Sequence, residues 1–162
     1  VIVTEQGTAI RFNEEDVRPM GRTARGVTAI KLEEGDAITS MEVVEPGGDL
    51  FIATVKGYGR RTALDEFRSQ SRGGKGIKAY KVTKRTGPVT SARVVQPRDE
   101  ITLISENGII LRTQVSSIPQ MGRYSQGVGL IDLKEGDRVA SVARLAEEVA
   151  KVEEALPAES SS

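Results

Sequence analysis

The chain has 162 residues, with no cysteine, no histidine and 17 glycines. This length suits one ordinary domain, and abundant glycine with few aromatic residues favours short strands joined by turns over a helical bundle. The lack of cysteine excludes a disulfide framework and a thiolate metal site, and it is compatible with a reducing cytoplasm. The lack of histidine removes the commonest general base and weakens any hydrolase interpretation. No apolar run is long enough to span a membrane, so we expect no membrane partner, and the opening Val1 in place of Met predicts a fragment or a processed chain.

The formal net charge is zero, but the charges are distributed unevenly along the chain. Residues 1–48 carry a net charge of −4, residues 49–98 of +9, residues 99–148 of −3 and residues 149–162 of −2. A basic middle between acidic flanks indicates a polyanion as the partner of the middle section.

Three copies of one unit make up most of the chain, at about 1–48, 49–98 and 99–148. The same residue types recur at fixed offsets from one anchor glycine in each unit, which is the signature of a repeat architecture. The anchors are Gly7, Gly57 and Gly108; four residues later come Arg11, Arg61 and Arg112, fifteen later Arg22, Arg72 and Arg123, and nineteen later Gly26, Gly76 and Gly127.

Each unit predicts about four short strands, which in the first unit span residues 1–4, 9–12, 27–32 and 38–44. Turns separate the strands, and Asn107-Gly108 in the third unit is a strong hairpin signal. Alternation of apolar and polar residues is imperfect outside the third strand, as expected for strands that are buried on both faces. The pattern therefore predicts an all-β, propeller-like fold with three four-stranded blades.

A different pattern follows the third unit. Apolar residues from Leu145 to Leu156 lie at helical spacing, and Pro157 ends the run. The sequence predicts a short C-terminal helix or a disordered acidic tail over residues 149–162. The sharper hypothesis is that this acidic tail competes with a polyanionic partner for the basic unit.

The most distinctive stretch runs from Gln70 to Gly76 and holds two cations and three glycines. Glycine lets the backbone approach a ligand closely, and cations beside exposed N–H groups form a site for phosphate. The alternative is a tight surface turn with solvated charges. A nucleotide P-loop is excluded, because Gly76 follows Lys75 where serine or threonine is required.

Several runs resemble the C-terminal domain of the DNA gyrase A subunit. They are residues 20–27, 57–62, 66–77 and 121–128, and the resemblance covers about residues 1–148. It implies a β-pinwheel, a propeller-like disc whose blades exchange strands and whose basic rim bends duplex DNA. It also implies that the parent enzyme introduces negative supercoils with ATP and Mg²⁺ bound outside this chain. We therefore expect no cofactor, no metal and no catalytic residue here, since the strand-cleaving residue of the family lies in another domain.

The hallmark of that family, the gyrase A-box, reads Gln, basic, Arg, Gly, Gly, basic, Gly. Ser71 departs from its second, basic position, and the matching residues are Gln70, Arg72, Gly73, Gly74, Lys75 and Gly76. Because the full box belongs to the first blade in the family, the variant implies a later blade, so the chain resembles the last three blades of a six-bladed disc. The related alternative is the topoisomerase IV protein of the same A type, which shares the repeats but usually lacks an intact box.

The resemblance and the charge pattern together predict a double-stranded DNA-binding site made of cations spaced along the rim. The residues predicted to contact DNA are Arg11, Arg22, Arg25, Arg60, Arg61, Arg68, Gln70, Arg72, Gly73, Gly74, Lys75, Gly76, Lys78, Lys81, Arg112 and Arg123. Tyr58, Tyr80 and Phe67 are expected in the core or in turns, because the aromatic residues are too few for a base-stacking platform.

Further partners are implied by the resemblance: the rest of the gyrase A subunit, together with the gyrase B subunit, in the bacterial cytoplasm at the nucleoid. Three blades are fewer than usually close a propeller, which predicts self-association through open sheet edges or reliance on further blades. Two other classes stay open. A protein-interaction scaffold would use the acidic first and third units, and a catalytic propeller would need convergent acids that the sequence does not indicate.

Overall fold

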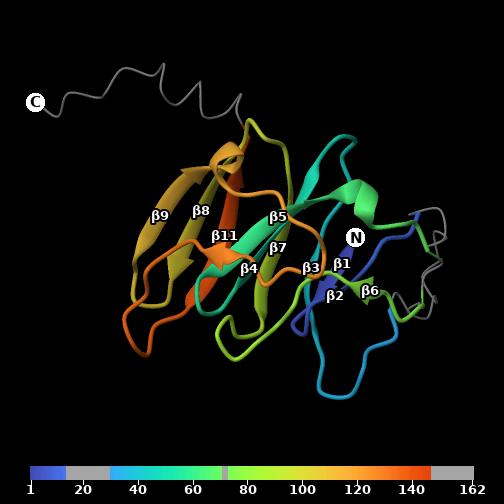
Figure 1. Ribbon diagram of the computed structural model, residues 1–162, viewed down its shortest axis with the longest axis horizontal. Helices are drawn as coiled ribbons and strands as arrows, with labels where there is room; N and C mark the ends of the chain where they lie inside the picture. The colour runs from blue at the N-terminus through green and yellow to red at the C-terminus, as the bar shows by residue number, and fades with distance from the viewer. Residues whose placement is uncertain (14–29, 71–72, 147–162) are drawn as a thin grey trace, which may run out of the picture.

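The computed structural model describes residues 1–13, 30–70 and 73–146 of the chain. These residues form three antiparallel sheets that lie side by side, as Figure 1 shows. The all-β, propeller-like prediction is confirmed. Nothing helical in the described part is long and apolar enough to cross a bilayer. The C-terminal helix or tail predicted over 149–162 lies outside the described residues, as does the first half of the strand predicted over 27–32.

Two of the sheets have four strands and the third has three among the described residues. The first sheet runs in the order β3-β1-β2-β6, with β1 (Ile2–Thr4), β2 (Thr8–Ile10), β3 (Ile38–Met41) and β6 (Ile77–Lys78). The second runs β10-β5-β4-β7, with β4 (Asp49–Thr54), β5 (Tyr58–Ala63), β7 (Val89–Val95) and β10 (Val128–Gly129). The third runs β11-β8-β9, with β8 (Glu100–Ser105), β9 (Ile110–Gln114) and β11 (Val139–Leu145). Single 3-10 turns, η2 (Leu64–Glu66) and η3 (Val115–Ser117), follow β5 and β9.

Neighbouring repeats exchange a strand. The second repeat supplies β6, which pairs with β2 of the first sheet, with Ile77 opposite Ala9. The third repeat supplies β10, which pairs with β5 of the second sheet, with Val128 opposite Gly59. No described residue supplies such a strand to β9, so the third sheet has three strands in the described part of the chain. The reason is that the fourth strand of each blade belongs to the repeat that follows it.

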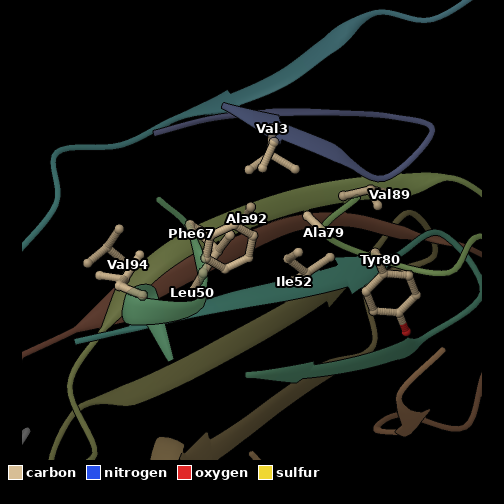
Figure 2. Close-up of a cluster of buried hydrophobic side chains, with 11 residues drawn as sticks. Val3, Leu50, Ile52, Phe67, Ala79, Tyr80, Val89, Ala92 and Val94 are labelled. Carbon is tan, nitrogen blue, oxygen red and sulfur yellow. The ribbon is translucent and has the colours of Figure 1, made fainter. Parts of the chain in front are cut away.

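Most of the hydrophobic core fills the two spaces between the sheets, and a third, smaller cluster of Ile2, Ile10 and Ile30 lies apart from them. Alternate side chains of β4 enter opposite spaces: Leu50 and Ile52 face the first sheet, where Val3 of β1 meets them, as Figure 2 shows. Phe51 and Ala53 face the third sheet. All six residues of β4 are buried, which explains why the sequence of this strand shows no alternation. Phe67 and Tyr80 are buried too, as expected for them from the sequence.

One edge of each sheet meets the others at the centre of the molecule. The Thr39 hydroxyl of β3 donates to the Thr90 carbonyl of β7 at 2.7 Å, and the Thr90 hydroxyl donates to the Val139 carbonyl of β11 at 3.2 Å. The strands β6, β10 and β9 are therefore at the opposite, outer edges. We call these outer edges the rim.

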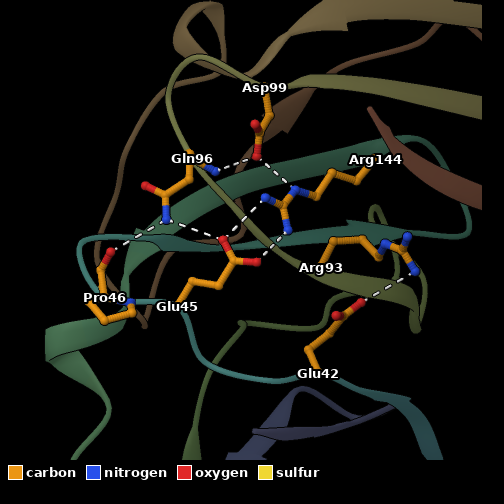
Figure 3. A network of polar contacts seen from close by, with 7 residues as sticks. All are labelled: Glu42, Glu45, Pro46, Arg93, Gln96, Asp99 and Arg144. Atoms are coloured by element: carbon orange, nitrogen blue, oxygen red, sulfur yellow. Dashed lines mark hydrogen bonds and ion pairs between the residues drawn. The ribbon is translucent and has the colours of Figure 1, made fainter. Parts of the chain in front are cut away.

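A polar network, drawn in Figure 3, ties the first repeat directly to the third. The Arg144 guanidinium donates to both carboxylate oxygens of Glu45, at 3.0 and 3.2 Å, and to Asp99 at 2.7 Å. The hydrogen bond from Arg144 is the main reason that the pKa of Glu45 lies below its ordinary value, and it likewise raises the pKa of Arg144. A bidentate pair of this kind fixes the relative orientation of its two partners, here of two repeats that share no sheet.

The lowered pKa of Glu45 predicts a pH-dependent contribution to stability. Its carboxylate stabilises the fold above its unfolded-state pKa, and this contribution is lost as the pH falls through the lower, folded-state pKa. We expect the urea midpoint of the unaltered chain to fall more between about pH 7 and about pH 3 than that of Glu45→Gln. Glu106→Gln, at an exposed pair with Arg138, is the control and should keep the full pH dependence. If the urea midpoint of the unaltered chain and that of Glu45→Gln fell equally with pH, the stabilising role of the Glu45 carboxylate would be contradicted.

Gly57 and Gly108 form a matched pair for testing the strand exchange. Both anchors have positive φ, +88° and +87°. A Cβ on Gly57 would meet the carbonyl oxygen of Ile131, in the arriving third repeat, at 2.7 Å, whereas a Cβ on Gly108 would meet nothing within 4 Å. Gly57→Ala should therefore be less stable than Gly108→Ala by roughly 1–3 kcal/mol in urea denaturation, beyond the backbone strain that both share. Equal losses would show that no strand packs at Gly57.

Candidate nucleic-acid interface

A long run without acidic residues forms the basic part of the molecule. From Phe67 to Arg98, both included, the sequence has nine lysines and arginines and no aspartate or glutamate. The first part of this run leaves η2, and the backbone N–H of Gln70 donates to the Arg11 carbonyl at 2.6 Å. It then passes through the box-like turn, residues 70–76, and enters β6 at the rim of the first sheet.

The box-like turn is held to the first repeat by its glycines. The Gly74 carbonyl accepts the backbone N–H of Lys31 at 2.8 Å. Gly76 lies so close to β2 that a Cβ would come within 2.6 Å of the Ala9 carbonyl oxygen. Lys75, the described cation of this turn, is exposed. Exposed side chains along this edge belong to Arg68, Lys75, Lys78 and Lys81, while Gln70 and Gly73 are half-buried.

Arg61 and Arg11, which the sequence placed on the DNA-binding rim, are occupied inside the protein. Arg61 Nη1 pairs with Asp49 at 2.7 Å and its Nε donates to the Ile118 carbonyl at 2.8 Å, so only 16% of its side chain is exposed. Arg11 makes the equivalent contact one repeat earlier, with Nη1 at 3.4 Å from the Phe67 carbonyl. These two arginines join the first and second sheets to the 3-10 turn of the next repeat.

Arg112, at the third of these positions, has no such turn to reach among the described residues. It pairs instead with Glu100 of its own sheet at 2.5 Å, and half of its side chain is exposed. The equivalence of Arg11, Arg61 and Arg112 in the sequence therefore does not extend to their surroundings.

Arg60 is a correction to the predicted site. Its side chain is fully buried in the second sheet, so it has no surface to offer to DNA. Its guanidinium lies 4.7 Å from the centre of the Tyr80 ring. Burial lowers the pKa of Arg60 to about 10, which still leaves the group charged at neutral pH.

Arg123 sits beside the basic edge of the first sheet. It belongs to the loop from Met121 to Gly127, which is the third repeat's counterpart of the box-like turn; we call it the third-repeat loop. Its Nη1 donates to the Lys78 carbonyl of β6 at 2.8 Å, and its guanidinium lies 5.1 Å from the centre of the Tyr124 ring, which is 67% exposed. The fold thus brings Arg123 next to Lys78, although 45 residues separate them in the sequence.

Two further cations meet where the second and third repeats join, and the sequence analysis missed them. Lys56 and Lys134 line a depression of about 330 Å³ together with Arg85, whose Nε donates to the Tyr58 hydroxyl at 2.8 Å. The acidic residues Glu135 and Asp137 line the same depression. Lys134 lies in an acidic repeat, so the net charge of that repeat gives no sign of a cation at this surface. The turn signal around Gly136, which recurs in the repeats, was the one sequence feature that could have placed Lys134 at this junction.

Arg22, Arg25 and Arg72 lie outside the described residues. In the described part of the chain no three acidic side chains gather in a way that could hold a metal ion.

The strand exchange, the inter-sheet cores and the basic rim define a class: propeller-like domains built from repeats that complete one another's sheets. The family model for the DNA gyrase C-terminal domain, a beta-propeller, matches residues 1–45, 48–96 and 99–146. The chain therefore belongs to the DNA gyrase C-terminal domain family, which confirms the resemblance found in the sequence.

Named relatives agree with this assignment. The chain is 46% identical over 144 residues to the DNA gyrase A subunit of Haloquadratum walsbyi and 42% identical over 156 residues to that of Streptomyces coelicolor. The alignments cover 88% and 95% of this chain but only 17% and 18% of those two relatives.

Solved structures show the same architecture. The C-terminal domain of a DNA topoisomerase IV matches with a TM-score of 0.83 at 29% identity, covering 94% of this chain and 50% of that one. A DNA gyrase A C-terminal domain matches with a TM-score of 0.80 at 32% identity, covering 89% and 49%. The chain thus spans about half the length of these solved domains.

Substitution of Arg61 and of Arg112 distinguishes a structural role from a DNA-binding role at these equivalent positions. Arg61→Met leaves Asp49, only 4% exposed, without its cation and should lower stability by roughly 1.5–3 kcal/mol in urea denaturation. Arg112→Met breaks an exposed pair and should cost less than about 1 kcal/mol. If Arg61→Met kept full stability and reduced only DNA affinity, Arg61 would return to the DNA interface.

Proposed function

We propose that this domain binds duplex DNA along its basic rim and bends it, without reading base sequence. The observation that carries the proposal is the row of exposed cations on the outer edge of the first sheet, which Arg123 of the third repeat joins. The row comprises Arg68, Lys75, Lys78 and Lys81, and Arg72 extends it in the sequence. Phosphate is the ligand that such a row fits, because each contact releases counterions and needs no particular base.

The rigid body behind the rim supports the bending part of the proposal. Bending 20–30 base pairs costs roughly 1–6 kcal/mol, so the surface that holds the bend must resist an opposing force. The two inter-sheet cores and the Glu45–Arg144 pair join all three repeats into one body. Several phosphate contacts on such a body can offset the deformation energy of the DNA.

The wider role that we propose follows the gyrase relatives. The domain would steer duplex DNA for a parent gyrase that supercoils DNA with ATP and Mg²⁺ bound elsewhere, and it would work with the gyrase B subunit as well as the rest of the gyrase A subunit. Its place of action would be the cytoplasm, at the nucleoid. The likeness to a topoisomerase IV domain makes the A-type protein of that enzyme the second candidate parent. Self-association through β9, which pairs outward with no described strand, stays a prediction.

The rim cations predict the salt dependence of DNA binding. We expect affinity for random-sequence relaxed duplex DNA, measured by fluorescence anisotropy over a salt series, to fall steeply with salt. Lys75→Gln/Lys78→Gln should weaken binding on every sequence and reduce the slope of log affinity against log salt by about 0.9 for each phosphate that is no longer bound. Arg72→Ala/Lys75→Ala should act in the same direction.

Arg98→Gln/Arg138→Gln is the charge-matched control, because both side chains are exposed and lie off the first sheet's outer edge. It should leave the slope nearly unchanged. Equal effects of the two double variants would mean that net charge, and not the rim, governs binding. Salt-independent binding, or none, would favour a protein-interaction scaffold.

A further inference from the structure

Arg60 is a buried cation whose hydrogen bonds all go to neutral groups. It donates to the Thr62 hydroxyl and the Ala79 carbonyl, both at 2.5 Å, and to the carbonyls of Arg123 at 3.0 Å and Ser125 at 3.3 Å. No acidic side chain in the described ranges forms an ion pair with it, and its Nε has no partner there. A buried guanidinium without a counterion is costly, so its retention at this position calls for a role.

Two of the three carbonyls that Arg60 binds, those of Arg123 and Ser125, belong to the third-repeat loop, and neighbouring side chains bind two more carbonyls of that loop. The Thr62 hydroxyl donates to the Met121 carbonyl at 2.8 Å, and the Tyr80 hydroxyl donates to the Gln126 carbonyl. Four carbonyls of a seven-residue loop are thus bound by buried donors of the second repeat. This arrangement fixes the path of the loop over Arg60.

Several backbone N–H groups of the same loop are left for an outside acceptor. Those of Gly122, Arg123, Tyr124 and Gln126 have no acceptor among the described residues, and Gly122 and Tyr124 are exposed. Backbone N–H groups next to an arginine side chain, above a buried positive charge, are complementary to an anionic oxygen.

At the position equivalent to Arg60, the other two repeats have an apolar residue and no buried cation. Ile10 occupies the position in the first repeat and Leu111 in the third. Ile10 is buried, as an ordinary core residue of a strand should be. A charge at this position is therefore not needed to build a blade, which separates the role of Arg60 from general packing.

We propose that Arg60 is a positioning residue for a phosphate-binding site formed by the third-repeat loop: it orders the loop's backbone from below and adds a buried positive charge beneath it. The nearby Glu66 carboxylate offsets part of this charge but forms no ion pair with Arg60. The inference rests on the proposed function, since the phosphate belongs to bound duplex DNA. Arg60 itself touches no DNA; it acts through the backbone that carries Arg123.

A double-mutant cycle tests this coupling. Arg60→Met should lower DNA affinity and reduce the salt slope by about 0.9, the equivalent of one bound phosphate. Arg123→Gln should weaken binding in the unaltered chain but have little further effect in the Arg60→Met background. Lys75→Gln, in the separate box-like turn, should have its full effect in both backgrounds.

Val142→Ala, in the core between the second and third sheets, is the control for reduced stability and should keep the unaltered salt slope. The proposal is overturned if Arg60→Met binds DNA as this control does. It is overturned equally if Arg123→Gln has the same effect in both backgrounds, or if Arg60→Met couples as strongly to Lys75 as to Arg123.

Hydrogen exchange keeps the test decisive if Arg60→Met does not fold. Arg60→Lys retains the charge with fewer donors. The hydrogen-bonded amides of the loop, those of Met121, Ser125 and Gly127, should therefore exchange faster than in the unaltered chain while those of β4 do not. Unchanged exchange in the loop would refute the positioning role. If the unaltered chain bound DNA without salt dependence, the proposed function would fail, yet the exchange result would still decide whether Arg60 orders the loop.

Discussion

The exchange of a single short strand between neighbouring repeats is the constraint on which the rest of this structure depends. β6 and β10 have only two residues each, yet each one completes a sheet that belongs to the preceding repeat. From β6 the chain continues into Ala79 and Tyr80, which are buried between the first two sheets. The hydrogen-bond register of one short strand therefore also fixes core packing, and no repeat is complete without the next one.

The same exchange places the basic turns. The box-like turn ends where β6 begins, and the third-repeat loop ends where β10 begins, so each turn is held at the outer edge of a sheet from the preceding repeat. Close backbone contact at Gly76 and buried donors beneath the third-repeat loop restrict both turns. The surface that we propose for binding DNA phosphates is thus built at a junction between repeats, where two chain segments constrain it.

The arginines of this domain have three different roles, and the role of each depends on how far its side chain is removed from water. Arg61 is largely buried against Asp49 and joins two repeats, because a desolvated ion pair holds one geometry. Arg60 is fully buried and bound by neutral oxygens, which orders a loop. Arg68 stays solvated and remains available for an external anion. A charge count treats these residues as equal, although water has been removed from only two of them.

The sequence by itself determined the repeat, the all-β class and the basic middle section, because these follow from spacing and composition along one chain, and its motifs indicated the family by resemblance. It also indicated the core or a turn for Tyr80. Only the tertiary structure decided that the fourth strand of each blade comes from the next repeat, that Arg60 and Arg61 serve the protein interior, and that Arg123 lies beside Lys78. Spacing specifies which residues recur, whereas burial and contact depend on which other segment packs against them, and that is settled only when the sheets assemble.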